Sequence, residues 1–335
     1  MTIRESLEER EREYLSPFAA LSAESKGRDK DEPACDIRPV FQRDRDRIIH
    51  CKSFRRLKDK TQVFLAPEGD HYRTRLTHTL EVSQNARTIA KALRLNEDLT
   101  EAIALGHDLG HTPFGHAGER ALNDICSLGF EHSEQSVRTV ELLEKDGQGL
   151  NLTWETRDGI LNHQTKGEPA TLEGKVVRFS DKIAYIHHDM DDAVRAGILT
   201  ELDVPAEIRS VLGMTPSERL DTFIHDIITS SMGTNDVLMS DRVANAMKGI
   251  RNFMFENVYT NSVAKSEEGK AEALIKSLYK YFYEHPSKMP ELYINLIQNY
   301  KEEPERVVCD YVASMSDRYA IKVYNDLFVP ISWEY

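Results

Sequence analysis

Residues 106–119 read Gly106-His107-Asp108-Leu109-Gly110-His111-Thr112-Pro113-Phe114-Gly115-His116-Ala117-Gly118-Glu119. The four glycines and the proline predict that the chain leaves a helix here and turns sharply. The stretch also holds three histidines and two carboxylates, and ionisable clusters of this density mark functional sites. His107 and Asp108 are adjacent, and both side chains are good metal ligands. We therefore interpret them as half of a metal site, which needs a histidine upstream and a carboxylate downstream.

The composition is that of an ordinary globular protein, with 40% hydrophobic and 30% charged residues in a chain of 335. This length suffices for one large domain or two modest ones. No apolar run approaches a membrane span and the first residues lack a signal-peptide core, so we expect a cytoplasmic protein with no membrane partner. The cysteines show no C-x-x-C spacing, which argues against a zinc ribbon or a disulfide framework. They are Cys35, Cys51, Cys126 and Cys309.

The net charge of −13 argues against a general nucleic-acid coat protein, which needs a basic surface. It leaves room for an anionic substrate, because a pocket can be locally positive on an acidic protein. Segment 43–60 is locally positive, with eight lysine and arginine residues against three aspartates. A solvated helix face and a functional contact with a nucleotide or nucleic acid explain this segment equally well.

Apolar residues recur at helical spacing through most of the chain, which predicts an all-α fold. The exception is the β-prone run Thr61–Leu65, which predicts one small β-hairpin near residues 61–72. Polar residues are frequent in segment 310–319, within the last helix, and we interpret this segment as the wall of a pocket. From residue 41 onward the predicted helices span 41–57, 73–93, 99–108, 117–128, 131–143, 153–163, 172–196, 216–230, 237–258, 267–284, 290–299 and 304–325.

Two of these helices supply the missing ligands. His78 belongs to helix 73–93, and Arg75, three residues earlier, projects from the same face. A single histidine in such a place is more often structural, but the neighbouring arginine and the His-Asp pair after the next helix favour a ligand. Asp181 lies among apolar residues of helix 172–196, where burial of a carboxylate is costly unless a cation or a metal pairs with it. Tyr185 and Asp189 follow at i+4 and i+8, on the same helix face.

Together these residues form a mixed nitrogen and oxygen site of His78, His107, Asp108 and Asp181. Such a site suits Mn²⁺, Fe²⁺, Zn²⁺ or Ni²⁺ and, less ideally, Mg²⁺. The ligands are spread over more than a hundred residues, which indicates a catalytic site on a finished fold rather than a structural metal clip. A divalent ion there can lower the pKa of a bound water and neutralise phosphate oxygens.

This ligand arrangement resembles the HD superfamily of metal-dependent phosphohydrolases. Further blocks are similar to deoxyguanosinetriphosphatase-like dNTP triphosphohydrolases, and the similarity runs from about residue 15 to the C-terminus. The blocks are Arg43–His50, Phe54–Leu57, Lys60–Phe64, Arg75–His78, Gly106–Glu119, Phe130–His132, Phe179–Tyr185 and Asp310–Arg318.

The resemblance implies an HD-domain helical bundle with additional C-terminal helices. On this basis we expect a partly ordered N-terminal arm at residues 1–40, an HD core with the metal site at 41–200, and a C-terminal helical part at 201–335. The implied reaction is attack of water on the α-phosphorus of a dNTP, which gives the deoxynucleoside and tripolyphosphate.

Residue roles follow from the same resemblance. His78, His107, Asp108 and Asp181 would hold the metal, with Mn²⁺ or Mg²⁺ as the first candidates. His116 would be the catalytic histidine near the α-phosphate and Glu119 would orient it. Substrate contacts would come from His111 and His132 (phosphate or attacking water), Arg75 and Lys182 (triphosphate), Tyr185 (deoxyribose), and Gln62 and Asp189 (3′-hydroxyl).

Several alternatives stay open at this stage. Other HD enzymes bind a second metal through extra histidines, and His132 and His163 lie in the corresponding interval; we favour one metal because the resemblance gives His132 another role. The family implies a homo-oligomer, with tetramer and hexamer both open, as are the preferred base and an allosteric dNTP. Alternative functions are another HD phosphohydrolase (a nucleotidase or phosphodiesterase) and a non-catalytic nucleotide sensor or nucleic-acid-binding scaffold.

Overall fold

The computed structural model describes residues 1–62, 73–259 and 262–330. Within them the chain is helical and has no β-strand, and its β-type pairs are two isolated bridges, Arg28–Thr153 and Thr61–Thr74. The predicted all-α fold is therefore confirmed. The predicted hairpin near 61–72 lies mostly outside the described residues. No helix in the described ranges has both the length and the apolarity that a membrane crossing requires.

The chain forms two compact units that alternate along the sequence. Unit 1 comprises Met1–His50, Thr77–His107 and Asn151–Asn261, and unit 2 comprises Cys51–Leu76, Asp108–Leu150 and Ser262–Tyr335. The boundary between the two falls within the opening stretch, between His107 and Asp108. The expected division at residues 40 and 200 stays a prediction.

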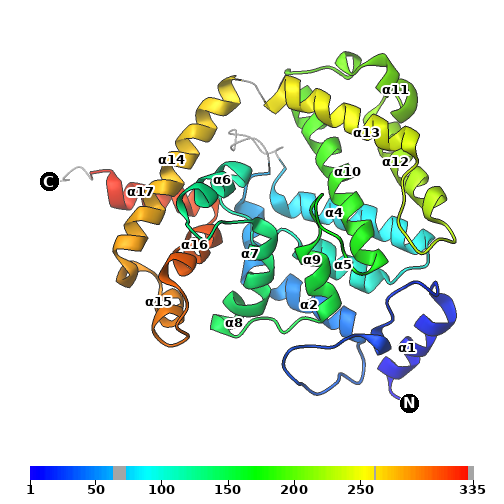
Figure 1. The fold of residues 1–335 in the computed structure, drawn as a ribbon, viewed down its shortest axis with the longest axis horizontal. Coiled ribbons are helices and arrows are strands. Elements are labelled where there is room, and N and C mark those ends of the chain that lie inside the picture. Colours follow the sequence, from blue (N-terminus) through cyan, green and yellow to red (C-terminus); the bar gives the residue numbers. More distant parts are fainter. Residues whose placement is uncertain (63–72, 260–261, 331–335) are drawn as a thin grey trace. The chain divides into compact units, whose positions relative to one another are not determined.

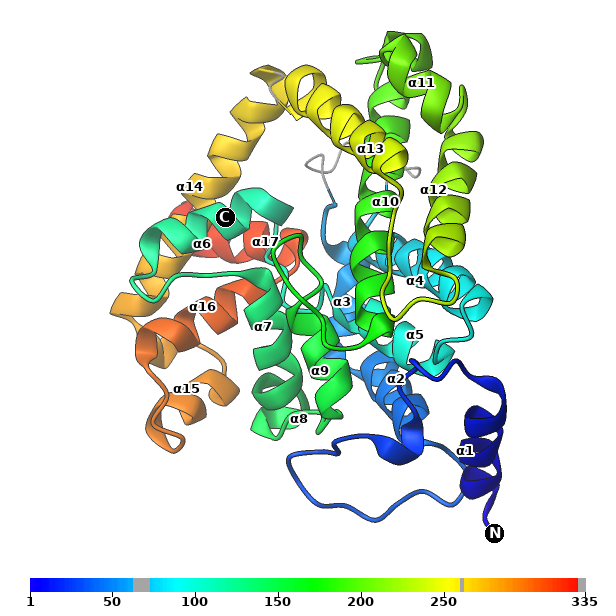
Figure 2. The ribbon, with the colours of Figure 1, turned by 45° about the vertical axis from the view of Figure 1, so that its right-hand side comes forward.

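Unit 1 is built around α5 (Glu97–Gly106), which packs against α2, α9 and α10. Seven of the ten residues of α5 are buried, and its N-cap Asn96 accepts a hydrogen bond from Leu99 N. The long helix α10 also packs against α12 and α13 (Figure 2). The other helices of this unit are α1 (Ile3–Tyr14), η1 (Ser22–Glu24), α2 (Val40–His50), α4 (Arg75–Ala92, from Thr77 onward), α9 (Trp154–Leu161), α10 (Leu172–Arg195), η4 (Glu201–Asp203), α11 (Ala206–Leu212), α12 (Pro216–Ser231), α13 (Asp241–Met254) and η5 (Phe255–Tyr259).

Gly106 lets α9 approach the end of α5. A Cβ atom on Gly106 would lie 2.5 Å from Cδ1 of Ile160, closer than van der Waals contact allows. His107 follows Gly106 directly, and His163 follows Ile160 by three residues. The two imidazole rings are 4.9 Å apart as a result of this close helix packing.

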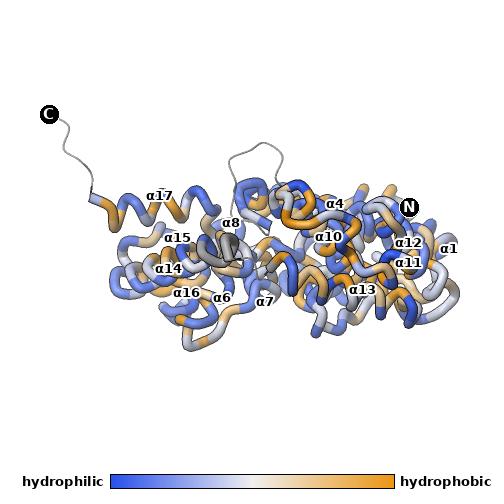
Figure 3. Tube along the Cα trace, turned by 90° about the horizontal axis from the view of Figure 1, so that it is seen from above, coloured by the Kyte–Doolittle hydropathy of each residue, from blue (hydrophilic) through white to orange (hydrophobic). Residues whose placement is uncertain are grey.

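Unit 2 has its core between α14 and the helices α6, α16 and α17 (Figure 1). Polar and apolar residues alternate along α17, as on a helix with one apolar face (Figure 3). The helices of this unit are α3 (Lys52–Arg56), η2 (Leu57–Asp59), α6 (Gly115–Ile125), α7 (His132–Arg138), η3 (Thr139–Leu143), α8 (Glu144–Gly147), α14 (Ser262–Glu284), η6 (Pro286–Lys288), α15 (Glu291–Gln298), α16 (Pro304–Ser314) and α17 (Asp317–Phe328).

The predicted single helix 304–325 is wrong in one respect, because the chain breaks between α16 and α17. Met315 adopts an extended conformation and Ser316 caps α17 by accepting a hydrogen bond from Tyr319 N at 3.4 Å. The helical periodicity of the apolar residues continues across this break, which is why the pattern alone suggests one helix.

Asp44 of α2 ties together three segments of unit 1. Its fully buried carboxylate forms an ion pair with Arg28 and accepts hydrogen bonds from Thr153 N at 2.8 Å, Thr153 Oγ1 at 2.6 Å and Thr156 Oγ1 at 2.9 Å. Removing one partner of a buried ion pair leaves the other charge uncompensated.

We expect Asp44→Ala to lower the free energy of unfolding by about 3–5 kcal/mol, because it removes one of the two carboxylates paired with the buried Arg28 and leaves the buried Thr153 amide without its acceptor. The matched control is Asp29→Ala, which removes a surface carboxylate paired with Arg157 in the same unit, and should cost about 1 kcal/mol or less. Urea unfolding followed by circular dichroism measures both. Equal losses in the two variants would contradict the prediction.

Candidate active site

Three of the four predicted metal ligands converge within unit 1. Nε2 of His78 on α4 lies 3.1 Å from Oδ1 of Asp181 on α10, and Nε2 of His107 at the end of α5 lies 3.7 Å from the same oxygen. Burial raises the pKa of the Asp181 carboxyl, but contact with His78 and the nearby His107 outweighs it and holds the pKa well below its usual range. Asp181 is therefore an anion that faces two imidazole nitrogens.

The protons on these imidazoles are placed by their other nitrogens. Nδ1–H of His107 donates to the carbonyl of Ala104 at 2.7 Å, so when the His107 ring is neutral its lone pair is on Nε2. Nε2 of His188 contacts the Glu81 carboxylate, and its Nδ1 lies 3.3 Å from Nδ1 of His78. When a neutral His188 donates to Glu81, it accepts from Nδ1–H of His78. The lone pair of His78 Nε2 then faces Asp181.

This donor set fits a divalent metal ion. Two imidazole lone pairs and a carboxylate oxygen that face one another repel unless they share a cation. First-row divalent metals take such mixed nitrogen and oxygen ligands, and a hydrogen bond from the second ring nitrogen of each ligand histidine is the usual support. His188 and Glu81 provide this support for His78 and were missed from the sequence. Their signal is the spacing, because Glu81 follows His78 at i+3 and His188 follows Asp181 at i+7.

The predicted sugar-binding residues of unit 1 lie further along α10. The hydroxyl of Tyr185 donates to Asp189, and burial followed by this charge raises the pKa of Tyr185. Burial, followed by Arg178, lowers the pKa of Lys182. Arg251 of α13 is near enough to both Tyr185 and Lys182 to lower their pKa values. Arg251 adds a second cation here that no sequence motif indicated.

The loop of unit 2 begins with a close backbone contact. Gly110 N donates to Ser136 Oγ at 2.9 Å, and a Cβ atom on Gly110 would lie 2.1 Å from Ser136 N of α7. Only glycine fits this approach of the loop to a helix backbone. The contact places the loop beside α7, which begins at His132.

Glu119 of α6 links two histidines. Nδ1 of His116 lies 3.1 Å from one carboxylate oxygen, while the backbone N and ring Nδ1 of His132 both lie 2.8 Å from the other. Burial would raise the pKa of Glu119, but the hydrogen bonds with both histidines hold it well below its usual range. Burial lowers the pKa of His132, yet the bond to Glu119 outweighs it and the pKa is raised.

His111 completes this cluster without joining the hydrogen bonds. Its ring stacks on His132 with centroids 4.5 Å apart, and ligand atoms of His111, His116, Glu119 and His132 all lie within 4.8 Å of one another. Burial and then Arg75 lower the pKa of His111 well below its ordinary value. Neither ring nitrogen of His111 has a hydrogen-bond partner among the described residues. A buried neutral imidazole with two unused nitrogens indicates a ligand position.

Arg75 is placed differently from a simple phosphate anchor. Its guanidinium is buried and donates to Oδ2 of Asp108 at 2.7 Å and to the Gln62 carbonyl at 3.4 Å. The side-chain oxygen of Gln62 is buried and accepts no hydrogen bond from any residue that the structure describes. Through these two hydrogen bonds Arg75 connects Asp108, a predicted metal ligand, with Gln62, a predicted sugar contact, within unit 2.

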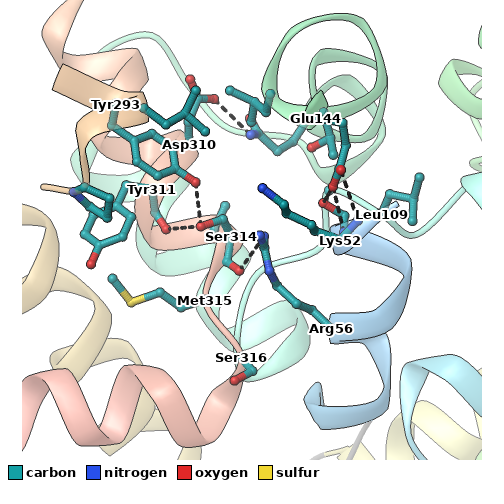
Figure 4. Close-up of a pocket in the computed structure, with 18 of the residues that line it drawn as sticks. Lys52, Arg56, Leu109, Glu144, Tyr293, Asp310, Tyr311, Ser314, Met315 and Ser316 are labelled. Carbon is teal, nitrogen blue, oxygen red and sulfur yellow. Dashed lines mark hydrogen bonds between the residues drawn. The ribbon is translucent and has the colours of Figure 1, made fainter. Parts of the chain in front are cut away.

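Segment 310–319 lines a cavity of about 490 Å³ in unit 2, which agrees with its interpretation as a pocket wall (Figure 4). Arg56 donates to the Ser314 carbonyl at 3.2 Å, and Tyr293 donates to Ser314 Oγ at 2.8 Å (Figure 4). None of the predicted site residues lines this cavity. Of the stretch 106–119, only Leu109 and Gly110 contribute to its wall.

Comparison with known proteins assigns the chain. Residues 75–186 match the HD domain and residues 237–326 match the phosphohydrolase-associated domain. The deoxyguanosinetriphosphate triphosphohydrolase-like protein of Caldanaerobacter subterraneus is 58% identical, with 99% of this chain and 98% of that protein aligned. The protein of the same name from Clostridium perfringens is 50% identical, with 98% of each chain aligned. The chain belongs to this family.

As a member of this family the chain is an HD-domain phosphohydrolase, as predicted. HD domains bind divalent metals, and the histidine and aspartate groups described above are able to hold one. A crystal structure of a phosphohydrolase from Bacteroides thetaiotaomicron is similar with a TM-score of 0.51 at 16% identity, over 84% of this chain and 68% of that one. At that identity the likeness concerns the fold alone.

The Glu119 cluster gives a spectroscopic prediction. We expect Glu119→Gln to lower the pKa of His132, because the neutral amide removes the negative charge that, together with the hydrogen bond, outweighs burial. A titration of the histidine ring signals by NMR measures this shift. The control is Glu134→Gln, which removes another carboxylate from α7, the helix of His132. An unchanged His132 pKa in Glu119→Gln would refute the assigned pairing.

Proposed function

We propose that the chain is a metal-dependent dNTP triphosphohydrolase. A water oxygen bonds to the α-phosphorus, the bond from that phosphorus to the 5′-oxygen breaks, and a proton passes to the 5′-oxygen. The products are a deoxynucleoside and tripolyphosphate. The observation that supports this most directly is the Glu119 bridge to His116 and His132, an acid–base group that starts eight residues after Asp108.

Metal binding is assigned to His78, His107, Asp108 and Asp181. His107 and Asp108 are adjacent in the stretch 106–119, and His78 lies on α4. Mn²⁺ and Mg²⁺ are the first candidates, with Fe²⁺, Zn²⁺ and Ni²⁺ as alternatives. When bound, such an ion lowers the pKa of a coordinated water and neutralises phosphate charge.

His116 is assigned the proton transfer. Its Nδ1–H donates to Glu119, which fixes the ring and leaves Nε2 outside this bond. The side chain is 51% exposed, so that Nε2 is available to a substrate. His132, paired with the other oxygen of Glu119, keeps that carboxylate ionised and in place.

Binding of the substrate is assigned to the remaining residues. Arg75 and Lys182 would contact the triphosphate, where positive charge offsets repulsion between phosphate and carboxylates. His111 would contact phosphate or the attacking water. Tyr185 would pack under the deoxyribose at the place of a 2′-hydroxyl. Gln62 and Asp189 would bond to the 3′-hydroxyl. The homo-oligomer, tetramer or hexamer, stays a prediction, as do the cytoplasmic location, the allosteric dNTP and the contact with nucleic acid.

Incubation with each dNTP, and separately with each dNMP, in the presence of Mn²⁺ or Mg²⁺, with the phosphorus product identified by ³¹P NMR, tests the reaction. Tripolyphosphate supports the proposal. Orthophosphate released from a dNMP would instead indicate another HD phosphohydrolase, and binding without turnover would indicate a nucleotide sensor.

We expect His116→Ala to lower kcat by roughly 10²- to 10⁴-fold, because it removes the proton-transferring imidazole. Bound metal, measured by plasma mass spectrometry, should stay at the wild-type level. The control is His225→Ala, which removes an exposed histidine of α12. Activity like that of wild type in His116→Ala would refute its role.

The sugar contact predicts a change in specificity. Tyr185→Ala should reduce the preference for a dNTP over the rNTP of the same base by roughly tenfold or more, because it opens room for the 2′-hydroxyl. Tyr185→Phe keeps the ring and should keep the preference, although it loses the bond to Asp189. The measured quantity is the ratio of the two kcat/KM values. A preference that survives in Tyr185→Ala would exclude this steric role.

A further inference from the structure

Asp317 contacts two segments of unit 2 that lie far from it in sequence. Its Oδ2 accepts hydrogen bonds from Thr61 N at 2.9 Å and from Thr61 Oγ1, and its Oδ1 accepts from Phe114 N at 3.0 Å. The residue is 6% exposed. No cation lies within ion-pair distance of its carboxylate among the described residues. The carboxylate is therefore committed to backbone and hydroxyl donors.

Lys60, the neighbour of Thr61, joins the same two segments. Its buried Nζ donates to the carbonyl of His111 and to the carbonyl of Ala313 at 2.9 Å. Lys60 O accepts from Arg75 N at 3.0 Å. Three stretches of chain, 60–61, 111–114 and 313–317, are thus connected by two buried ionisable side chains, the Asp317 carboxylate and the Lys60 amine.

The loop residue that Asp317 holds has an unfavourable backbone conformation. Phe114 has φ +62° and ψ +26°, in the left-handed region that bulky residues rarely adopt. It precedes α6, and its N–H is the group that Asp317 accepts. Such a conformation persists only when surrounding contacts enforce it. His116 follows two residues later, so the conformation of this turn sets the position of His116.

We propose that Asp317 and Lys60 are positioning residues for the loop 111–116, and that they act on the reaction by setting the place of His111 and His116. This proposal rests on the proposed function for its effect on turnover. Asp317 belongs to the segment that matches the phosphohydrolase-associated domain, and the loop belongs to the segment that matches the HD domain. The C-terminal segment therefore contacts, through Asp317, the loop that carries His111 and His116.

Glu144 offers a control with the same chemistry. Its Oε1 accepts from Ser53 N at 2.7 Å and from Ser53 Oγ at 2.6 Å, and its Oε2 accepts from Lys52 N at 3.0 Å (Figure 4). It is 5% exposed, against 6% for Asp317. Both carboxylates thus bind two backbone amides and one hydroxyl within unit 2, but Glu144 holds α3 and not the loop.

The test compares Asp317→Asn with Glu144→Gln in the full chain. Each change turns one acceptor oxygen into a donor group, so both should lower Tm by similar amounts. We expect kcat of Asp317→Asn to fall roughly 10- to 100-fold with KM within about threefold, since displacement of a catalytic group by about 1 Å costs this much. Glu144→Gln should keep kcat within about threefold. Equal kcat losses in the two variants would overturn the proposal.

A second readout does not depend on turnover. Amide hydrogen exchange, followed by mass spectrometry, should accelerate in residues 111–116 of Asp317→Asn and stay unchanged there in Glu144→Gln. If Asp317→Asn does not fold, Thr61→Val, which removes only the hydroxyl donor, should show the same acceleration to a lesser degree. Unchanged exchange of residues 111–116 in a folded Asp317 or Thr61 variant would refute the proposal that Asp317 positions this loop. If the wild-type protein shows no dNTP turnover but the variants show this exchange pattern, the proposed function is refuted and the positioning role of Asp317 is not.

Discussion

Buried carboxylates that accept hydrogen bonds from loop amides hold this chain together. A helix satisfies its own backbone, but a loop buried between helices does not, and an unpaired buried amide is costly. In the described residues no sheet supplies the missing acceptors. Carboxylates supply them at several loops and helix starts: Asp44 for Thr153, Glu119 for His132, Glu144 for Lys52 and Ser53, Glu155 for Lys26, Glu173 for Ala20 and Asn96, and Asp317 for Thr61 and Phe114. Part of the acidic composition thus serves the fold.

The candidate site uses the same device for chemistry. Glu119 accepts the backbone N–H of His132, as a structural carboxylate would, and it also accepts from the rings of His132 and His116. One side chain therefore fixes the start of α7 and orients two imidazoles. Asp181 plays the corresponding part in unit 1, where two imidazole nitrogens face its Oδ1. The peptide bond between His107 and Asp108 joins these two groups along the chain.

Periodicity and residue type predicted much of this arrangement, because they act over a few residues. The helices follow from apolar spacing, and the ligand helices follow from His78 and Asp181 on otherwise apolar faces. The break at Met315 and Ser316 could not be predicted in this way, since Asp317 bonds to partners 203 and 256 residues away. The role of His188 was missed for a related reason: its partners His78 and Glu81 lie on another helix. The spacing of Glu81 from His78 and of His188 from Asp181 is the only local trace of these contacts, and it does not say which residues meet.

The environment then gives chemically identical histidines different roles. His111 and His132 stack 4.5 Å apart, so two positive charges there would repel. Glu119 favours the proton on His132 and raises its pKa, while burial and Arg75 keep His111 neutral. His116 shares Glu119, but its side chain is half exposed, whereas His111 and His132 are buried. Divergent pKa values in one cluster are how acid and base roles are assigned at neutral pH. Because His111 stays neutral, its two ring nitrogens can accept from a water or donate to a phosphate without a change of charge.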